Sequence, residues 1–171
     1  MVATLRLLMM LGSFGAFVYA YYMWKNSQIK PAEGKPEMAH LKAAIATGAF
    51  IVLYDLVWEN LGLILNWWRS NQALFYIGYC PADVLFDFFF MVSALCLFFP
   101  KREDTRWGLL FILAGSIGNE FLEKSLVDIG LMNYMTYYNV VYATALYAIA
   151  WILMYGAFYK FYNYFKKSKP M

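Results

Sequence analysis

Three pairs of acidic residues lie within long apolar segments of this 171-residue chain. Helical residues three or four positions apart share one face of the helix, so the two carboxyl groups of each pair are expected to point the same way. An ionisable side chain inside a membrane costs about 2.5 to 3.5 kcal/mol and usually faces the bundle interior or a wet cavity. The pairs are Asp55 with Glu59, Asp83 with Asp87, and Glu120 with Glu123.

Two kinds of chemistry suit these carboxyl groups. A carboxyl group in apolar surroundings tends to keep its proton, and close carboxyl groups share one, which equips them as a general acid. Carboxylates from two helices could instead hold a hard divalent cation such as Mg²⁺, which prefers oxygen ligands. The cofactor is therefore either absent or Mg²⁺, and the candidate catalytic residues are Asp55, Glu59, Asp83, Asp87 and Glu120.

A zinc or haem site is not expected, because the chain holds no cluster of thiol and imidazole ligands. The single histidine, His40, lies in the first predicted loop. It is expected to be solvated or interfacial on the cytoplasmic side, away from the acids.

The segments that must position the acids are long enough to cross a membrane. Hydrophobic residues make up 63% of the chain and charged residues 15%, far from the balance of a soluble domain. About 20 helical residues cross a hydrocarbon layer of roughly 30 Å. The sequence therefore predicts an all-α integral membrane bundle, a single domain over 1–171, with five transmembrane helices at about 5–24, 41–68, 74–99, 107–126 and 138–161.

Basic residues predict the orientation of this bundle, because cytoplasmic loops carry the excess of Lys and Arg. With five crossings, only Arg6, Arg69 and Lys124 of the 14 Lys and Arg residues fall on the side of the N-terminus. The N-terminus is therefore predicted outside and the C-terminus in the cytoplasm, with the protein in the cytoplasmic membrane. In this orientation all three acidic pairs lie in the outer half of the membrane.

The stretch WWRSNQALFYIGYCPADVLFDFFF over 67–90 resembles the small membrane lycopene cyclases of actinobacteria and archaea. Those proteins have a Trp followed by a Pro-x-Glu-Glu segment that runs into a Phe-rich helix. The matching residues here are Pro81, Asp83 and Val84, so Val84 replaces the second acid, and Asp87 follows one turn later. The resemblance implies an acid-catalysed reaction on a polyisoprenoid within a helical membrane fold.

A second resemblance covers more of the chain. An acidic second segment, the run PADVLFDFFF, a Phe-Phe-Pro helix end, a glutamate in the fourth segment and a Tyr-Asn step into the fifth follow in order. This order is similar to a group of uncharacterised five-helix membrane proteins of Gram-positive bacteria. It implies the architecture and no particular activity.

Two functions remain as alternatives at this point. The first, which we put ahead of the second, is a non-catalytic subunit or assembly component of a membrane complex. In it the carboxyl groups would hydrogen-bond within the bundle or to a protein partner, and Glu120 would form an ion pair with Lys124. The expected partners are membrane lipids and other membrane proteins. Nucleic acid is not expected, because the net charge is only +3 and the basic residues are spread along the chain.

The second function is an intramembrane acid/base enzyme of the cyclase or isomerase type. Asp83 or Glu59 would protonate a double bond of a polyisoprenoid or other lipid. Aromatic ring faces attract cations and would stabilise the carbocation that results. The rings near the acids in sequence are Trp58, Trp67, Phe88, Phe89 and Phe90.

Overall fold

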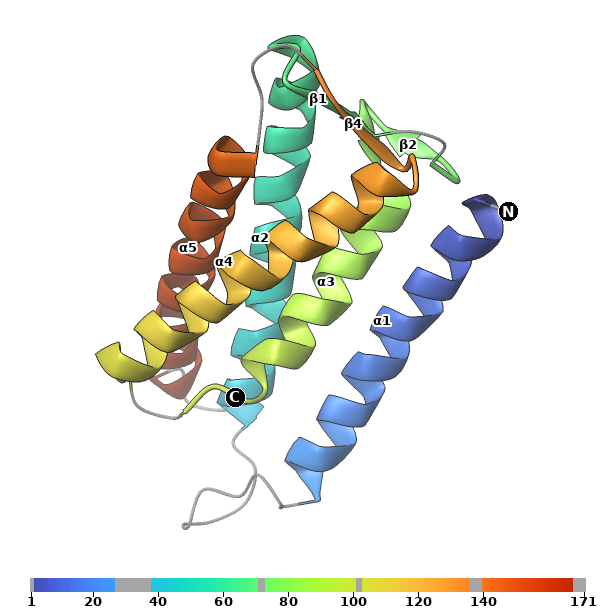
Figure 1. Cartoon of the computed structure of the whole chain (residues 1–171). Coiled ribbons are helices and arrows are strands. Elements are labelled where there is room, and N and C mark those ends of the chain that lie inside the picture. The colour runs from blue at the N-terminus through green and yellow to red at the C-terminus, as the bar shows by residue number, and fades with distance from the viewer. Residues whose placement is uncertain (1, 27–37, 71–72, 101–102, 136–139, 168–171) are drawn as a thin grey trace.

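The computed structural model describes residues 2–26, 38–70, 73–100, 103–135 and 140–167. In these ranges the chain forms a helical bundle with short strands at one end (Figure 1). The helices are α1 (Val2–Lys25), α2 (Met38–Ile64), α3 (Ala82–Cys96), α4 (Thr105–Asp128) and α5 (Val140–Lys167). The strands are β1 (Trp68–Ser70), β2 (Tyr76–Ile77), β3 (Cys80–Pro81) and β4 (Met132–Tyr134). The prediction of a helical bundle is confirmed.

Three helices of the described ranges are long and apolar enough to cross a membrane: Ala3–Lys25, Met38–Ile64 and Val141–Lys167. They indicate an integral, multi-pass membrane protein. The other two helices differ for physical reasons. Helix α3 has 15 residues, about 22 Å at 1.5 Å per residue, and α4 carries several charged side chains near its end. Five crossings and their orientation therefore stay predictions.

The predicted helix over 74–99 is wrong in its first part, where the chain forms the β2–β3 hairpin instead. Tyr76 pairs with Pro81 and Ile77 with Cys80. Gly78 opens the turn with φ of +63°, a conformation that favours glycine. The helix begins only at Ala82, because Pro81 lacks the N–H that a helix interior needs.

The predicted end of the second helix at 68 is also wrong, since α2 ends at Ile64. Asn66 takes a left-handed φ of 56°. The Trp67 N–H then donates to the Gly62 carbonyl at 2.8 Å, and the Asn66 N–H donates to Leu63 at 3.0 Å. These two bonds form a Schellman cap that stops the helix and releases the chain into β1.

Strand β1 pairs antiparallel with β4, which follows α4, so Trp68 lies opposite Tyr134. We call β1 to β4 together the strand cap. It lies at the end of the bundle where α2 and α4 finish and where α1, α3 and α5 begin (Figure 1). The predicted start of the last helix at 138 lies outside the described residues.

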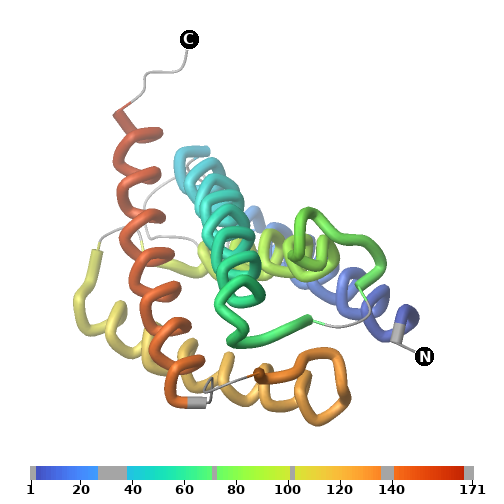
Figure 2. Tube along the Cα trace, turned by 90° about the horizontal axis from the view of Figure 1, so that it is seen from above, coloured from blue at the N-terminus to red at the C-terminus, as the bar shows by residue number. Residues whose placement is uncertain are grey.

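Helix packing follows an open row. Helix α2 packs between α3 and α5, α1 packs on α3, and α4 packs on α5 (Figure 2). Among the described residues no comparably extensive packing joins α4 to α2 or α3. In Figure 1, α4 crosses in front of these two helices.

The opposite end of the bundle holds a dense aromatic core around His40, which is 4% exposed. The histidine ring lies 5.0 Å from the Phe158 ring and 5.7 Å from the Tyr162 ring. Its Nε2 lies 3.1 Å from the Cys96 carbonyl oxygen. The expectation of a solvated or interfacial His40 is therefore wrong, because packing of α2 against α3 and α5 encloses it.

Candidate functional site

A cavity of about 280 Å³ lies between α4 and the helices behind it. All five helices contribute to its wall, from Arg6 on α1 to Trp151 on α5. Much of the wall is aliphatic, as at Ile51, Val92 and Leu126. Concave apolar sites with a few polar groups are typical of small-molecule binding. The cavity therefore suits the hydrocarbon part of a lipid-like ligand.

Carboxyl groups from three helices line this cavity: Asp55 and Glu59 from α2, Asp87 from α3 and Glu123 from α4. The structure thus brings together three of the five candidate catalytic residues, and adds Glu123, which the sequence analysis named only as a member of an acidic pair. Asp83 and Glu120 do not line the cavity. In two of the three acidic pairs, therefore, one carboxyl group lines the cavity and the other does not.

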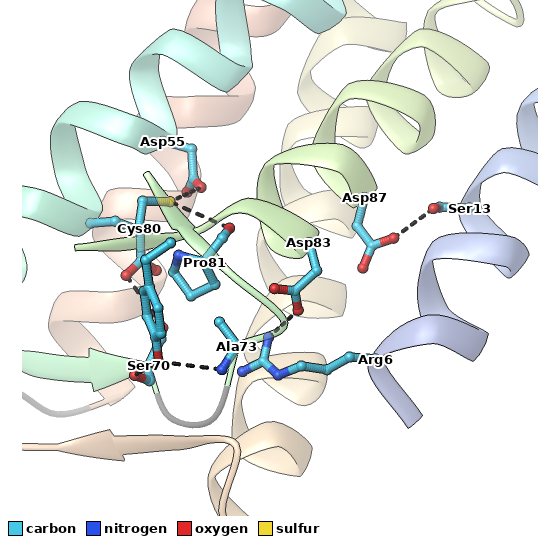
Figure 3. A network of polar contacts seen from close by, with 11 residues as sticks. Arg6, Ser13, Asp55, Ser70, Ala73, Cys80, Pro81, Asp83 and Asp87 are labelled. Carbon is cyan, nitrogen blue, oxygen red and sulfur yellow. Dashed lines mark hydrogen bonds and ion pairs between the residues drawn. The ribbon is translucent and has the colours of Figure 1, made fainter. Parts of the chain in front are cut away.

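Asp83 pairs with Arg6 instead, where α1 and α3 begin (Figure 3). Both side chains are buried, with 1% of Asp83 and 4% of Arg6 exposed. Asp83 lies in the first turn of α3, where the helix dipole favours a negative charge. The pairing commits Asp83 to the junction of the two helices.

A second polar contact joins the same two helices. The Ser13 hydroxyl donates to Asp87 Oδ1 at 2.6 Å (Figure 3). Arg6 and Ser13 are seven positions apart, so they lie on one stripe of α1, and both are buried. Arg6 and Ser13 therefore both contact α3, and the Asp87 side chain that Ser13 holds also lines the cavity.

Asp55 and Glu59 lie one turn apart on α2. Cys80 Sγ lies 4.0 Å from Asp55 Oδ2 (Figure 3). The Ser70 hydroxyl donates to Glu59 Oε2 at 3.3 Å, and the Trp68 indole lies against the same carboxyl group. Burial, followed by the nearby Asp55 carboxyl, raises the pKa of the Cys80 thiol. Cys80 is therefore a neutral donor beside Asp55.

Glu123 is the most enclosed of the cavity carboxyl groups, with 2% of its surface exposed. The hydroxyl groups of Tyr134 and Tyr147 hydrogen-bond to it. Burial, together with the Glu123 carboxyl, raises the pKa of Tyr134. The Tyr134 phenol therefore stays protonated as a donor, and Glu123 is held by residues on β4 and α5.

Glu120 lies one turn away and has a different role. The Thr144 hydroxyl donates to Glu120 Oε2 at 3.0 Å, so this residue links α4 to α5. The expected ion pair with Lys124 is not among the salt bridges of the described residues. The Lys124 side chain is exposed instead.

The carboxyl groups do not fit a metal site in the part of the chain that the structure describes. No three His, Cys, Asp or Glu side chains of those ranges are close enough together to hold an ion. The cavity acids come from separate helices, and Asp87 and Glu123 already have hydroxyl partners. The reaction proposed below therefore includes no step at Mg²⁺.

Comparisons with known proteins do not assign a function to this chain. No protein-family model matches the chain, and neither curated proteins nor solved structures give a match. The function is therefore inferred from the cavity and its polar groups.

Several residues of the site were not predicted from the sequence. Arg6 carried the strongest signal, because an arginine inside an apolar helix is as costly as a carboxylate and needs a partner. Ser13, seven positions later on the same face, was a weaker signal. Trp68, Ser70 and Tyr134 join the site only because β1 pairs with β4, and residues so far apart in sequence give no local sign of that pairing.

Proposed function

We propose that this membrane protein is an acid/base enzyme that acts on a polyisoprenoid or similar unsaturated lipid inside the bilayer. The observation that carries the proposal is the set of four carboxyl groups, from three helices, in the wall of one largely apolar cavity. The apolar wall suits a hydrocarbon chain, and the acids suit proton transfer to and from carbon. The resemblance of 67–90 to lycopene cyclases supports the same substrate class.

The proposed reaction begins with a proton from Asp55 or Glu59. Two carboxyl groups one turn apart in apolar surroundings are most stable when they share a proton. That proton adds to one carbon of a double bond, and the other carbon becomes a cation. Asp87 or Glu123 then takes a proton from a carbon beside the cation, so a double bond forms again. The product is an isomer, or a ring if a second double bond attacks the cation first.

Aromatic side chains in the cavity wall support the cationic intermediate. Trp58, Phe88 and Trp151 line the cavity, and their ring faces attract positive charge. Two of these rings belong to the set expected from the sequence. The remaining members of that set do not line the cavity: Trp67, Phe89 and Phe90.

Lipid access and topology belong to the same proposal. Because α4 packs on α5 and not extensively on α3, a hydrocarbon chain would enter the cavity sideways from the bilayer. We propose five crossings with the N-terminus outside and the C-terminus in the cytoplasm. Arg6, Arg69 and Lys124 lie toward the strand cap, whereas the remaining basic residues favour the other side as cytoplasmic.

The alternative is a non-catalytic subunit or assembly component, and one observation favours it. Asp83, Asp87 and Glu120 each form a polar contact with another helix, as residues of an assembly network would. Such contacts can stabilise a membrane bundle without any chemistry. In that case the cavity acids would complete a larger complex.

Solvent deuterium tests the enzyme proposal. The purified chain is incubated in D₂O with lycopene as the acyclic polyene, and the products are examined by mass spectrometry. Because the acid first exchanges with solvent, wild-type protein is expected to place deuterium on carbon in an isomerised or cyclised product. Asp55→Asn combined with Glu59→Gln should reduce labelling at least a hundredfold, which corresponds to the loss of general acid catalysis.

Glu120→Gln is the control, because it removes a carboxyl group that does not line the cavity, and it should retain labelling. Unlabelled lycopene with wild-type protein would overturn the enzyme proposal for this substrate class. Stoichiometric copurification with another membrane protein, unchanged by the double substitution, would then support the subunit alternative.

A further inference from the structure

A second pocket, of about 320 Å³, opens on the strand cap. We call it the cap pocket. Its wall comes from the end of α2, from β1 and from the β2–β3 hairpin, and it includes Arg69, Tyr76 and Tyr79. These three side chains are exposed. The cap pocket therefore meets solvent, and its wall is more polar than that of the cavity.

Glu59, Trp68 and Ser70 belong to the walls of both the cap pocket and the cavity. Only a thin layer of side chains therefore separates the two spaces, and a carboxyl group is part of it. The Ser70 hydroxyl donates to Glu59 at 3.3 Å, and the Tyr76 hydroxyl donates to the Ser70 carbonyl at 3.4 Å. Polar groups thus continue from the exposed hairpin to Glu59.

The other acids near the cavity do not share this position. Asp83 is paired with Arg6, Asp87 accepts from Ser13, and Glu123 is enclosed by tyrosine hydroxyls. Of the described carboxyl groups that line the cavity, Glu59 is the one that also lines the cap pocket.

Charged and titratable groups share the walls of both pockets with Glu59. On the cavity side they come from each of the five helices: Arg6, Asp55, Asp87, Glu123 and Tyr147. On the cap side Arg69, Tyr76 and Tyr79 line the cap pocket together with Glu59. Positive charge thus lies on both sides of Glu59. Asp55, one turn earlier on α2, interacts with Glu59 and can accept its proton.

We propose that Glu59 carries protons between the cap pocket and the cavity, so that the cavity acids exchange protons with water on the strand-cap side of the membrane. A hydronium ion in the cap pocket gives a proton to the Glu59 carboxylate and becomes water, and Glu59 then gives its proton to the Asp55 carboxylate. Glu59 ends as a carboxylate and Asp55 as a carboxylic acid, so charge and protons balance.

This inference rests on the proposed acid/base function for its purpose. After each reaction the donor has lost a proton, and a different carboxyl group has gained one. The donor must regain its proton before the next reaction, and an apolar cavity excludes most of the water that would supply it. A carboxyl group shared with an open pocket provides that supply.

A pH jump tests the route without any substrate. The full chain is held in lipid nanodiscs, the pH is lowered rapidly, and infrared spectroscopy follows the carboxyl band of Asp55, assigned by its loss in Asp55→Asn. In wild-type protein this band should rise quickly. Glu59→Gln keeps the shape of the side chain but cannot carry the proton, so the rise should slow at least tenfold.

Two controls separate proton transfer from a change of fold. Glu59→Asp restores a carboxyl group and should recover most of the rate, whereas Glu103→Gln, at an exposed position outside both pockets, should leave it unchanged. Leu63 lines the cap pocket and not the cavity, so Leu63→Cys labelled with a bulky maleimide should also slow the rise. The same label on Leu61→Cys, at an exposed position of α2, should not.

An unchanged rate in Glu59→Gln, or no response of the Asp55 band in wild-type protein at any pH, would overturn the proton route. This outcome is distinct from failure of the enzyme proposal. The lycopene experiment detects transfer to carbon, while the pH jump detects transfer to Asp55, so either result can be positive while the other is negative.

Discussion

The guanidinium group of Arg6 forms a buried ion pair with the carboxylate of Asp83, which is 77 positions away in the sequence. The pair lies where α1 and α3 begin, and α3 is the helix on which α1 packs. Most other side chains of this part of α1 are exposed and apolar, such as Leu7, Leu8 and Leu11. The ion pair is therefore a principal specific contact that fixes the first helix on the bundle.

Breaking this pair from one side should destabilise the protein strongly. Removal of one partner leaves a buried charge uncompensated, which costs about 3 to 5 kcal/mol. We expect Arg6→Met and Asp83→Asn each to lower the midpoint of thermal unfolding in nanodiscs. The double variant should lose clearly less than the sum of the two. Additive losses would show that the two side chains do not depend on each other.

The contact between Ser13 and Asp87 should contribute less. Loss of a hydrogen bond to a carboxyl group costs about 1 to 3 kcal/mol. Ser13→Ala is therefore expected to lower the same unfolding midpoint, but by less than either ion-pair variant. Ser125→Ala is the control, because the exposed Ser125 hydroxyl donates to the Phe121 carbonyl of its own helix. Equal effects of both serine variants would contradict the proposed link between α1 and α3.

The sequence predicted the helices well because long apolar runs have few alternatives in a membrane. The errors lie where backbone conformation ends a run without any change in hydrophobicity. Asn66 caps α2 and Gly78 turns the hairpin, and both lie among apolar and aromatic neighbours. Pro81 gave a usable local signal that the helix over 74–99 starts late.

The candidate site could be predicted only in part, because spacing along a helix fixes which residues share a face but not what that face meets. Asp55 and Glu59 share both a face and the cavity. Asp83 and Asp87 share a face too, but only Asp87 reaches the cavity, because Arg6 from α1 engages Asp83. Only the tertiary contact with α1 distinguishes the two.

Gly62 tests how closely α2 approaches the strand cap. A Cβ at this position would lie 2.3 Å from Trp68 Cε2, so Gly62→Ala must displace a buried indole ring. We expect a loss of about 1 to 3 kcal/mol in stability, together with a shift in tryptophan fluorescence. A Cβ at Gly118 would meet nothing within 4 Å, so Gly118→Ala should be neutral or stabilise α4 by up to about 1 kcal/mol. The opposite order of stabilities would refute this packing.

Tyr134 should make the stability of the folded protein depend on pH in the alkaline range. Its pKa is raised above the ordinary value of 10.0 by burial and by Glu123, so the folded protein favours the neutral phenol. A raised pKa adds stability that is fully present below about pH 10 and is lost as the pH rises further. The wild-type unfolding midpoint should therefore fall more steeply above pH 10 than that of Tyr134→Phe. Tyr22→Phe, at an exposed position of α1, should follow the wild-type curve.

Filling the cavity should remove its ligand while leaving the bundle intact. Ala150 lines the cavity from α5, whereas Ala145 on the same helix is exposed. Ala150→Trp would place a large ring where a hydrocarbon chain would lie, and Ala145→Trp adds the same ring outside. Native mass spectrometry of gently solubilised wild-type protein should show a bound isoprenoid-type lipid, which Ala150→Trp reduces at least tenfold and Ala145→Trp retains. Equal retention by both variants would mean that lipid binds elsewhere, and the enzyme proposal would then lose the cavity as its substrate site.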